Sequence, residues 1–104
     1  MADQRIINIL NKYLECIPEK FGLRSAFLFG SYSKGSQKEE SDLDIALVLD
    51  HMDDFFSTQN ELRKLRRSID LRIEPHPIKT EDFNSKNPFA LEIKSTGINL
   101  VTAI

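Results

Sequence analysis

The spacing of hydrophobic positions changes several times along the chain, and each change marks an expected element. Near the N-terminus, apolar residues recur every three or four positions until Pro18, which predicts an amphipathic helix of about four turns. Its apolar stripe consists of Ile6, Leu10, Tyr13, Leu14 and Ile17. A continuous apolar run follows at residues 26–29 and ends at Gly30, which predicts a strand covered on both faces. We expect the helix to pack on the sheet that contains this strand.

Three further elements are predicted between residues 42 and 74. Residues 42–49 begin with alternating polar and apolar positions and then become wholly apolar, which is typical of a central strand with an exposed first end. Residues 53–67 have the pattern of an amphipathic helix with a charged outer face. Alternation over residues 69–74 predicts a third strand, which we expect Pro75 and Pro77 to stop.

The C-terminal part of the chain predicts one more helix and one more strand. Asn87 is a suitable N-cap, Pro88 suits the first helical position and Gly97 suits the position after the last turn. A strand is then expected over residues 98–101. Helices interleaved with short strands predict an α+β fold, an α/β-type sandwich in which helices pack on a mixed sheet of about four strands.

Composition limits this fold to one modest core. The chain has 104 residues, of which 40% are hydrophobic, and a formal net charge of −2. A chain of this size predicts a single domain over residues 1–104. The acidic balance argues against strong direct binding of nucleic acid through a broad basic face. Cys16 is the only cysteine, and no run approaches the roughly 20 apolar residues of a membrane span. We therefore expect a cytoplasmic protein without a membrane segment.

The segment between Gly30 and Asp44 carries the candidate chemistry. A strand that ends in Gly30-Ser31 allows a sharp turn and a close approach to a ligand, and N–H groups after such a turn suit a phosphate. Asp42 and Asp44 project from the same face of a strand, about 6.6 Å apart at the backbone. Their carboxylates can converge on a hard divalent ion such as Mg²⁺, which would remove their mutual repulsion. A phosphate cradle beside such a pair indicates nucleotide chemistry.

Each of these features also has a purely structural interpretation. Gly30 and Ser31 also fit an ordinary strand-to-helix turn, and the two aspartates also fit a solvated strand end. His51 and His76 each stand in an expected loop without the spacing of metal ligands, so a structural or solvent-exposed role is expected for both. Neither a nucleophilic triad nor a zinc site competes with the carboxylate interpretation.

At these residues the sequence resembles the minimal nucleotidyltransferase family of the DNA polymerase beta-like nucleotidyltransferase superfamily. The matched pattern is Gly-Ser-x-x-x-Gly, a short polar spacer and Ser-Asp-x-Asp at the head of an apolar strand. Here these positions are Gly30, Ser31, Gly35, Ser41, Asp42 and Asp44. With a later carboxylate on a neighbouring strand, the resemblance extends from about residue 26 to residue 74, and it implies the polymerase beta-like nucleotidyltransferase fold.

The resemblance implies a set of site residues. Asp42 and Asp44 correspond to the first two carboxylate ligands of two Mg²⁺ ions, and a third carboxylate would bind the catalytic ion and assist deprotonation of the attacking hydroxyl. Asp70 is favoured for that third position. Glu74 is the alternative, because it follows four residues later on the expected strand and is expected to face the same side as Asp70. The nucleotide, ATP, would be held by Gly30, Ser31, Lys34 and Ser41, with Lys34 as a mobile positive charge.

The resemblance also implies a partner. Family members of this size commonly act as antitoxins of an RNase toxin of the HEPN (higher eukaryotes and prokaryotes nucleotide-binding) class. The expected reaction is transfer of AMP from ATP to a hydroxyl of that partner, within a homo- or hetero-oligomer. Two alternatives stay open: a catalytically vestigial antitoxin that acts by occlusion, and transfer to a small molecule such as an aminoglycoside.

Overall fold

A mixed four-stranded sheet with helices on both faces forms the structure. The computed structural model describes residues 4–30 and 42–102. Within them, the helices are α1 (Gln4–Glu15), α3 (Phe55–Leu65) and α4 (Pro88–Thr96), and the strands are β1 (Leu23–Phe29), β2 (Leu43–Leu49), β3 (Ile73–Lys79) and β4 (Ile98–Thr102). Short 3-10 turns lie at Glu19–Phe21, Arg66–Ser68 and Thr80–Asp82. The expected fold class is confirmed.

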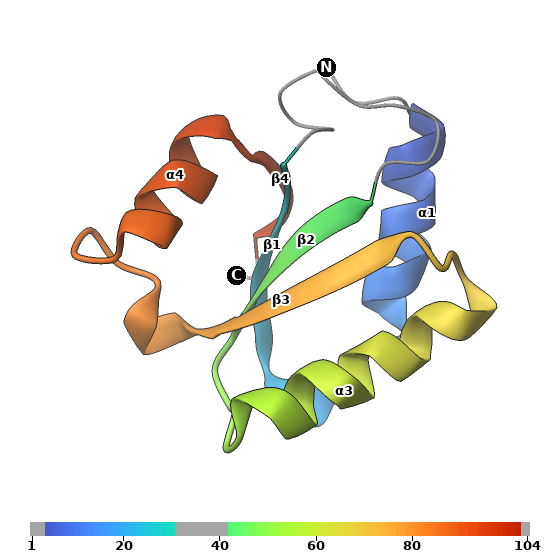
Figure 1. The fold of residues 1–104 in the computed structure, drawn as a ribbon, viewed down its shortest axis with the longest axis horizontal. Coiled ribbons are helices and arrows are strands. Elements are labelled where there is room, and N and C mark those ends of the chain that lie inside the picture. The colour runs from blue at the N-terminus through green and yellow to red at the C-terminus, as the bar shows by residue number, and fades with distance from the viewer. Residues whose placement is uncertain (1–3, 31–41, 103–104) are drawn as a thin grey trace.

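The strand order is β3-β2-β1-β4. β1 pairs with β2 and with β4 in antiparallel fashion, whereas β2 and β3 are parallel. The crossover from β2 to β3 passes through α3, as parallel pairing requires. Figure 1 shows α1 and α3 on one side of the sheet and α4 on the other. β2 is therefore covered on both faces, which explains its nearly continuous apolar sequence.

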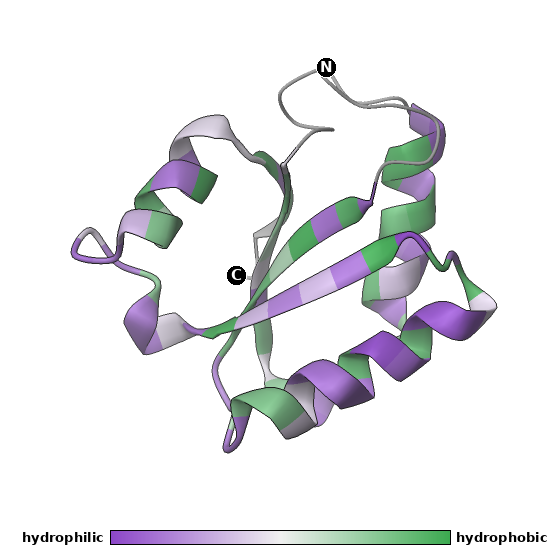
Figure 2. Ribbon diagram, in the orientation of Figure 1, coloured by the Kyte–Doolittle hydropathy of each residue, from purple (hydrophilic) through white to green (hydrophobic). Residues whose placement is uncertain are grey.

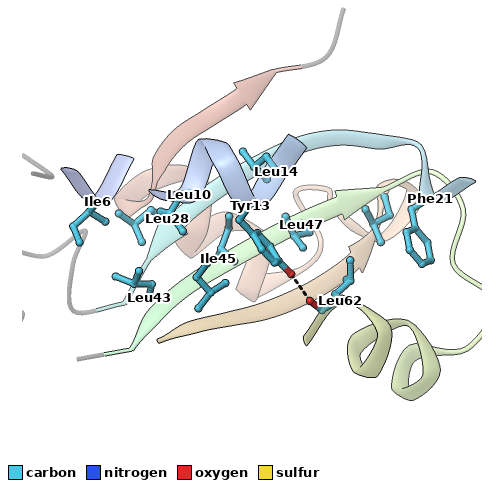
Figure 3. Packing of buried hydrophobic residues seen from close by; sticks show 13 residues of the cluster. Ile6, Leu10, Tyr13, Leu14, Phe21, Leu28, Leu43, Ile45, Leu47 and Leu62 are labelled. Atoms are coloured by element: carbon cyan, nitrogen blue, oxygen red, sulfur yellow. Dashed lines mark hydrogen bonds between the residues drawn. The ribbon is translucent and has the colours of Figure 1, made fainter. Parts of the chain in front are cut away.

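The larger part of the core lies between the sheet and helices α1 and α3. Alternate residues of β2 point into it, and α1 contributes the stripe that its sequence predicts (Figure 3). The buried residues of this part of the core are Ile6, Leu10, Tyr13, Leu14, Phe21, Ala26, Leu28, Leu43, Ile45, Leu47, Leu49, Leu62 and Ile73. Tyr13 is fully buried, and its hydroxyl donates a 2.8 Å hydrogen bond to the Leu62 carbonyl of α3. This bond joins the two helices beneath the sheet.

A smaller cluster lies under α4 on the opposite face. It contains Phe27, Ala46, Val48, Ile78 and Ile93. The expected ends of α4 are confirmed: the Asn87 side chain accepts a hydrogen bond from the N–H of Phe89, and the Gly97 N–H donates to Ile93. Figure 2 shows mixed hydrophilic and hydrophobic stretches along α3, as an amphipathic surface helix requires.

The expected boundaries of the third strand are wrong. β3 begins at Ile73 rather than near residue 69, and it runs through both prolines instead of stopping before them. The Leu43 N–H of β2 donates to the Arg72 carbonyl. In a parallel pair only every second residue of a strand forms hydrogen bonds with its neighbour, so the N–H and C=O groups of residues 73, 75 and 77 point away from β2. Proline is tolerated there because β3 is an edge strand and these positions donate no bond to the sheet.

Helix α3 covers this outward side of β3. The Gln59 side chain donates to the Pro75 carbonyl at 3.1 Å, and Arg66 donates to the Ile73 carbonyl at 2.8 Å. Two outward carbonyls of the edge strand thus accept hydrogen bonds from side chains of α3 and of the 3-10 turn that follows it. No helix in the described part of the chain has the length and apolar character needed to cross a membrane.

Candidate active site at the head of the second strand

Asp42 and Asp44 lie at the beginning of β2, at the rim of the sheet where the sequence predicted them. Asp42 is exposed immediately before the strand, and the Asp44 side chain is 27% exposed. The residues around Asp44 on the strand, Leu43 and Ile45, are fully buried in the core on the opposite face. Core packing therefore fixes the backbone and directs the Asp44 carboxylate to the other side.

Gly30 follows β1 directly beside Asp44, because Phe29 is the register partner of Asp44. Its φ of 75° is a left-handed conformation that glycine adopts at little cost. A β-carbon at this position would stand 2.6 Å from Oδ2 of Asp44, closer than any real contact. Glycine is required here for both the turn and the approach of the backbone to the carboxylate.

His76 is a site residue that the sequence analysis missed. It lies within β3, not in a loop as expected, and its Nε2 is 3.0 Å from Oδ1 of Asp44. Its ring meets the Phe29 ring edge-on, with 5.0 Å between ring centroids. Only the parallel register of β2 and β3 brings residues 44 and 76 together, and the sequence does not show strand direction. His51 does lie outside the helices and strands, as expected.

Asp70 lies outside β3, in the turn that precedes it. Both oxygens of its carboxylate accept hydrogen bonds from the Arg72 guanidinium, at 3.1 and 2.8 Å, and Oδ1 also accepts from the Arg72 backbone N–H. These bonds hold the pKa of Asp70 below its usual value, against a smaller opposing effect of burial. The favoured third carboxylate is thus paired with an arginine rather than standing on the expected strand.

Glu74 is the register partner of Asp44 on β3, but its carboxylate is also engaged. It accepts hydrogen bonds from Arg63 and Arg66 of the helix side, the Arg66 bond being 3.1 Å long. Partial burial raises the pKa of Glu74, and the two arginines outweigh this effect and hold it below its usual value. Glu74 therefore ties β3 to the end of α3.

The donor chemistry of Asp42 and Asp44 fits a divalent cation, since hard cations prefer carboxylate oxygens. Gly30 itself has no β-carbon that would stand against Oδ2 of Asp44. Over residues 4–30 and 42–102, no group of three or more acidic, histidine or cysteine side chains is gathered as a ready-made metal site. The predicted nucleotide-binding residues Ser31, Lys34 and Ser41 lie outside the described residues.

Comparison with known proteins agrees with this geometry. The family model described as "Polymerase beta, Nucleotidyltransferase" matches residues 4–103. A protein of Methanocaldococcus jannaschii named "Putative protein adenylyltransferase" is 44% identical over 45 residues, which make up 43% of this chain and 45% of the relative. "Protein adenylyltransferase MntA" of Thermococcus cleftensis is 43% identical over 42 residues, 40% of this chain and 42% of the relative. The matches thus span about half the length of these relatives.

Solved structures show the same fold. A crystal structure of a toxin-antitoxin with AMP-PNP superposes with a TM-score of 0.64 and 27% identity, and covers 93% of this chain and 73% of the other. A complex of the tri-AMPylated HEPN toxin of Shewanella oneidensis with its MNT antitoxin has a TM-score of 0.52 and 24% identity, with 96% of this chain and 69% of the other covered. At 24% identity, the likeness to this second structure shows a shared fold.

Proposed function

Because the chain belongs to the polymerase beta nucleotidyltransferase family, we propose that it transfers AMP from ATP to a hydroxyl of a partner protein. The hydroxyl oxygen would lose its proton and bond to the α-phosphorus, and the bond to the β-phosphate would break and release pyrophosphate. The partner would be a toxin of the HEPN class, with this chain as its antitoxin. The observation that carries the proposal is Asp44 at the rim of the sheet directly beside Gly30, with Asp42 exposed just before the same strand. The named relatives and the toxin-antitoxin complexes of the same fold support the choice of acceptor.

Each site residue has a defined task in this proposal. Asp42 and Asp44 would hold Mg²⁺, with Asp70 as the proposed third carboxylate and Glu74 as the alternative. When bound, such ions stabilise the attacking and leaving oxygens of an in-line displacement. Gly30 and Ser31 would bind the β- and γ-phosphates, with Lys34 and Ser41 as further nucleotide contacts. Asp70 would keep its bonds to Arg72 in this role, because Oδ2 accepts one hydrogen bond and a carboxylate oxygen has a second lone pair for a cation.

A binding antitoxin without catalysis is the second candidate. It is favoured by one observation: in the described residues, both candidates for the third carboxylate already accept hydrogen bonds from arginines. In that case the protein would silence its partner by covering it. The two candidate functions differ in whether suppression of the partner requires the carboxylates of Asp42 and Asp44.

The decisive experiment incubates the protein with ATP radiolabelled at the α-phosphate, Mg²⁺ and the product of the neighbouring gene as the candidate acceptor. Catalysis predicts that the label is transferred to the partner and that Asp42→Asn and Asp44→Asn abolish transfer. Asp53→Asn serves as the matched control, because Asp53 is an exposed carboxylate after β2. Labelling that persists in both site variants contradicts the proposed metal site. An Asp42→Asn/Asp44→Asn protein that still suppresses its partner favours occlusion.

A further inference from the structure

We propose that His76 is a positioning residue, which holds the Asp44 carboxylate in the orientation that binds the cation of a Mg²⁺–ATP complex. This inference rests on the proposed function and adds a residue to it. His76 and Asp44 come from adjacent parallel strands, with Ala46 as the register partner of His76. Side chains at 44 and 76 therefore share one face of the sheet, and they meet at 3.0 Å between Oδ1 and Nε2.

The two oxygens of the Asp44 carboxylate have different neighbours. Oδ1 accepts the hydrogen bond from His76, and Oδ2 lies beside Gly30, where even one additional carbon atom would collide with it. The hydrogen bond sets the rotation of the carboxylate, and the absence of a β-carbon at Gly30 leaves room for its other oxygen beside the backbone of that residue. A carboxylate oriented in advance loses less conformational freedom when a cation binds.

The direction of the hydrogen bond defines what the imidazole does. An ionised carboxylate only accepts hydrogen bonds, so the His76 ring must donate from Nε2. While that bond exists, this nitrogen carries a proton and is neither a metal ligand nor a base. The geometry therefore assigns His76 an orienting role that acts through Asp44, rather than direct contact with the reacting groups.

The imidazole is itself held in place by aromatic packing. The Phe29 ring meets it edge-on at 5.0 Å, and the Phe89 ring of α4 meets Phe29 at 5.6 Å and 86°. His76 also lies inside a strand, whose backbone is fixed by pairing with β2. The orienting contact therefore rests on a strand and on packed rings, which is the support a preorganised site needs.

The test measures Mg²⁺–ATP binding by isothermal titration calorimetry on the full chain. His76→Phe retains an aromatic ring against Phe29 but removes the donor, whereas His76→Gln retains an N–H donor near the position of Nε2. We expect His76→Phe to weaken binding about tenfold or more, as is typical when a group that orients a metal ligand is lost. We expect His76→Gln to bind nearly as well as the wild type. His51→Phe is the control for the substitution itself.

The outcomes separate this inference from the proposed function. Wild-type affinity in His76→Phe overturns the inference, and so does a His76→Gln protein that binds as weakly as His76→Phe, because the nitrogen would then act as more than a donor. His76→Leu also removes the donor and replaces His76→Phe if the latter does not fold. If the wild type shows no Mg²⁺-dependent binding of ATP, the proposed function itself fails.

Discussion

Gly30 stands so close to Asp44 that a β-carbon on it would lie 2.6 Å from Oδ2 of the carboxylate. The conformation of Gly30 at the end of β1 and the position of the Asp44 carboxylate on β2 therefore depend on each other. The antiparallel register that makes Phe29 the partner of Asp44 produces this contact.

The contact predicts the behaviour of Gly30→Ala. Alanine must either adopt a φ of 75°, at a cost of about 1–3 kcal/mol, or move the turn, and in both cases it displaces the Asp44 carboxylate. We expect lower stability in urea unfolding together with loss of Mg²⁺–ATP binding. Gly22→Ala is the matched control, because Gly22 has a φ of 60° at the other end of β1. Gly22→Ala should lose stability and keep nucleotide binding. Normal binding by Gly30→Ala contradicts the prediction.

Ligand binding should also raise the melting temperature. A ligand that binds the folded state at a hundred times its Kd stabilises it by about 2.7 kcal/mol. We expect Mg²⁺ with ATP to produce such an increase in thermal denaturation of the wild type, and EDTA to reverse it. Asp42→Asn and Asp44→Asn should not respond. An equal response in the wild type and in Asp44→Asn would show that the nucleotide binds elsewhere.

The roles of Asp70 and Glu74 can be separated by comparing Asp70→Asn with Glu74→Gln. Glu74 joins Arg63 and Arg66 to the edge strand, so Glu74→Gln should lower the free energy of unfolding by about 1 kcal/mol. Asp70→Asn weakens the bonds from Arg72 and should also lower the free energy of unfolding, but it should in addition abolish transfer of the label from ATP, if Asp70 is the third carboxylate. The opposite pattern in the labelling assay, with Glu74→Gln inactive and Asp70→Asn active, assigns the third position to Glu74.

Tyr13 provides a test of the core between α1 and α3. Tyr13→Phe removes the bond to the Leu62 carbonyl and should cost about 1 kcal/mol in urea unfolding. Burial raises the pKa of Tyr13 well above its usual value of about 10. The folded state therefore retains a proton that the unfolded state loses, and stability should fall as pH rises above about 10. Tyr13→Phe should show a smaller loss over that range, and an unchanged loss contradicts the assignment.

Asp50 should contribute to stability at the other end of the pH range. Hydrogen bonds from Arg24 and Thr80 hold the pKa of Asp50 at about 2. Because its unfolded pKa is about 4, this contribution is complete above pH 4 and disappears as pH falls towards 2. Asp50→Asn should lower the melting temperature at pH 7 and make it less sensitive to acid. Identical acid profiles for the variant and the wild type would exclude this contribution.

Local patterns were sufficient for most elements of the fold. Helix α1 follows from its apolar stripe, and the ends of α4 follow from Asn87 and Gly97, because caps act within a few residues. The third strand was misplaced because alternation continues through the preceding turn. Leu71, one of the alternating apolar residues of the segment 69–74, is 68% exposed. The prolines were misinterpreted because their effect depends on whether the strand lies at an edge, which is a property of the whole sheet.

The candidate site was predicted in the same uneven way. Asp44 lies on β2 and Asp42 directly before it, so their place at the rim follows from where the apolar run of the strand begins. Their neighbour His76 lies 32 residues beyond Asp44 and meets it only through parallel pairing. The hydrogen bonds from Arg72 to Asp70 and from Arg66 to Glu74 likewise depend on the packing of side chains around the strand. The spacing of polar and apolar residues along the sequence does not predict such contacts.

The covering of β3 has a consequence for how this protein associates with others. An exposed strand edge is a template for pairing with another chain, and it promotes aggregation when it is left open. In β3, prolines replace the outward donors at 75 and 77, and Gln59 and Arg66 already occupy outward acceptors. A second polypeptide therefore cannot extend the sheet at this edge by backbone pairing. Any contact made on this side of the molecule must use the exposed side chains of α3, such as Phe56, because Gln59 and Leu62 of the same helix are already engaged with the edge strand and the core.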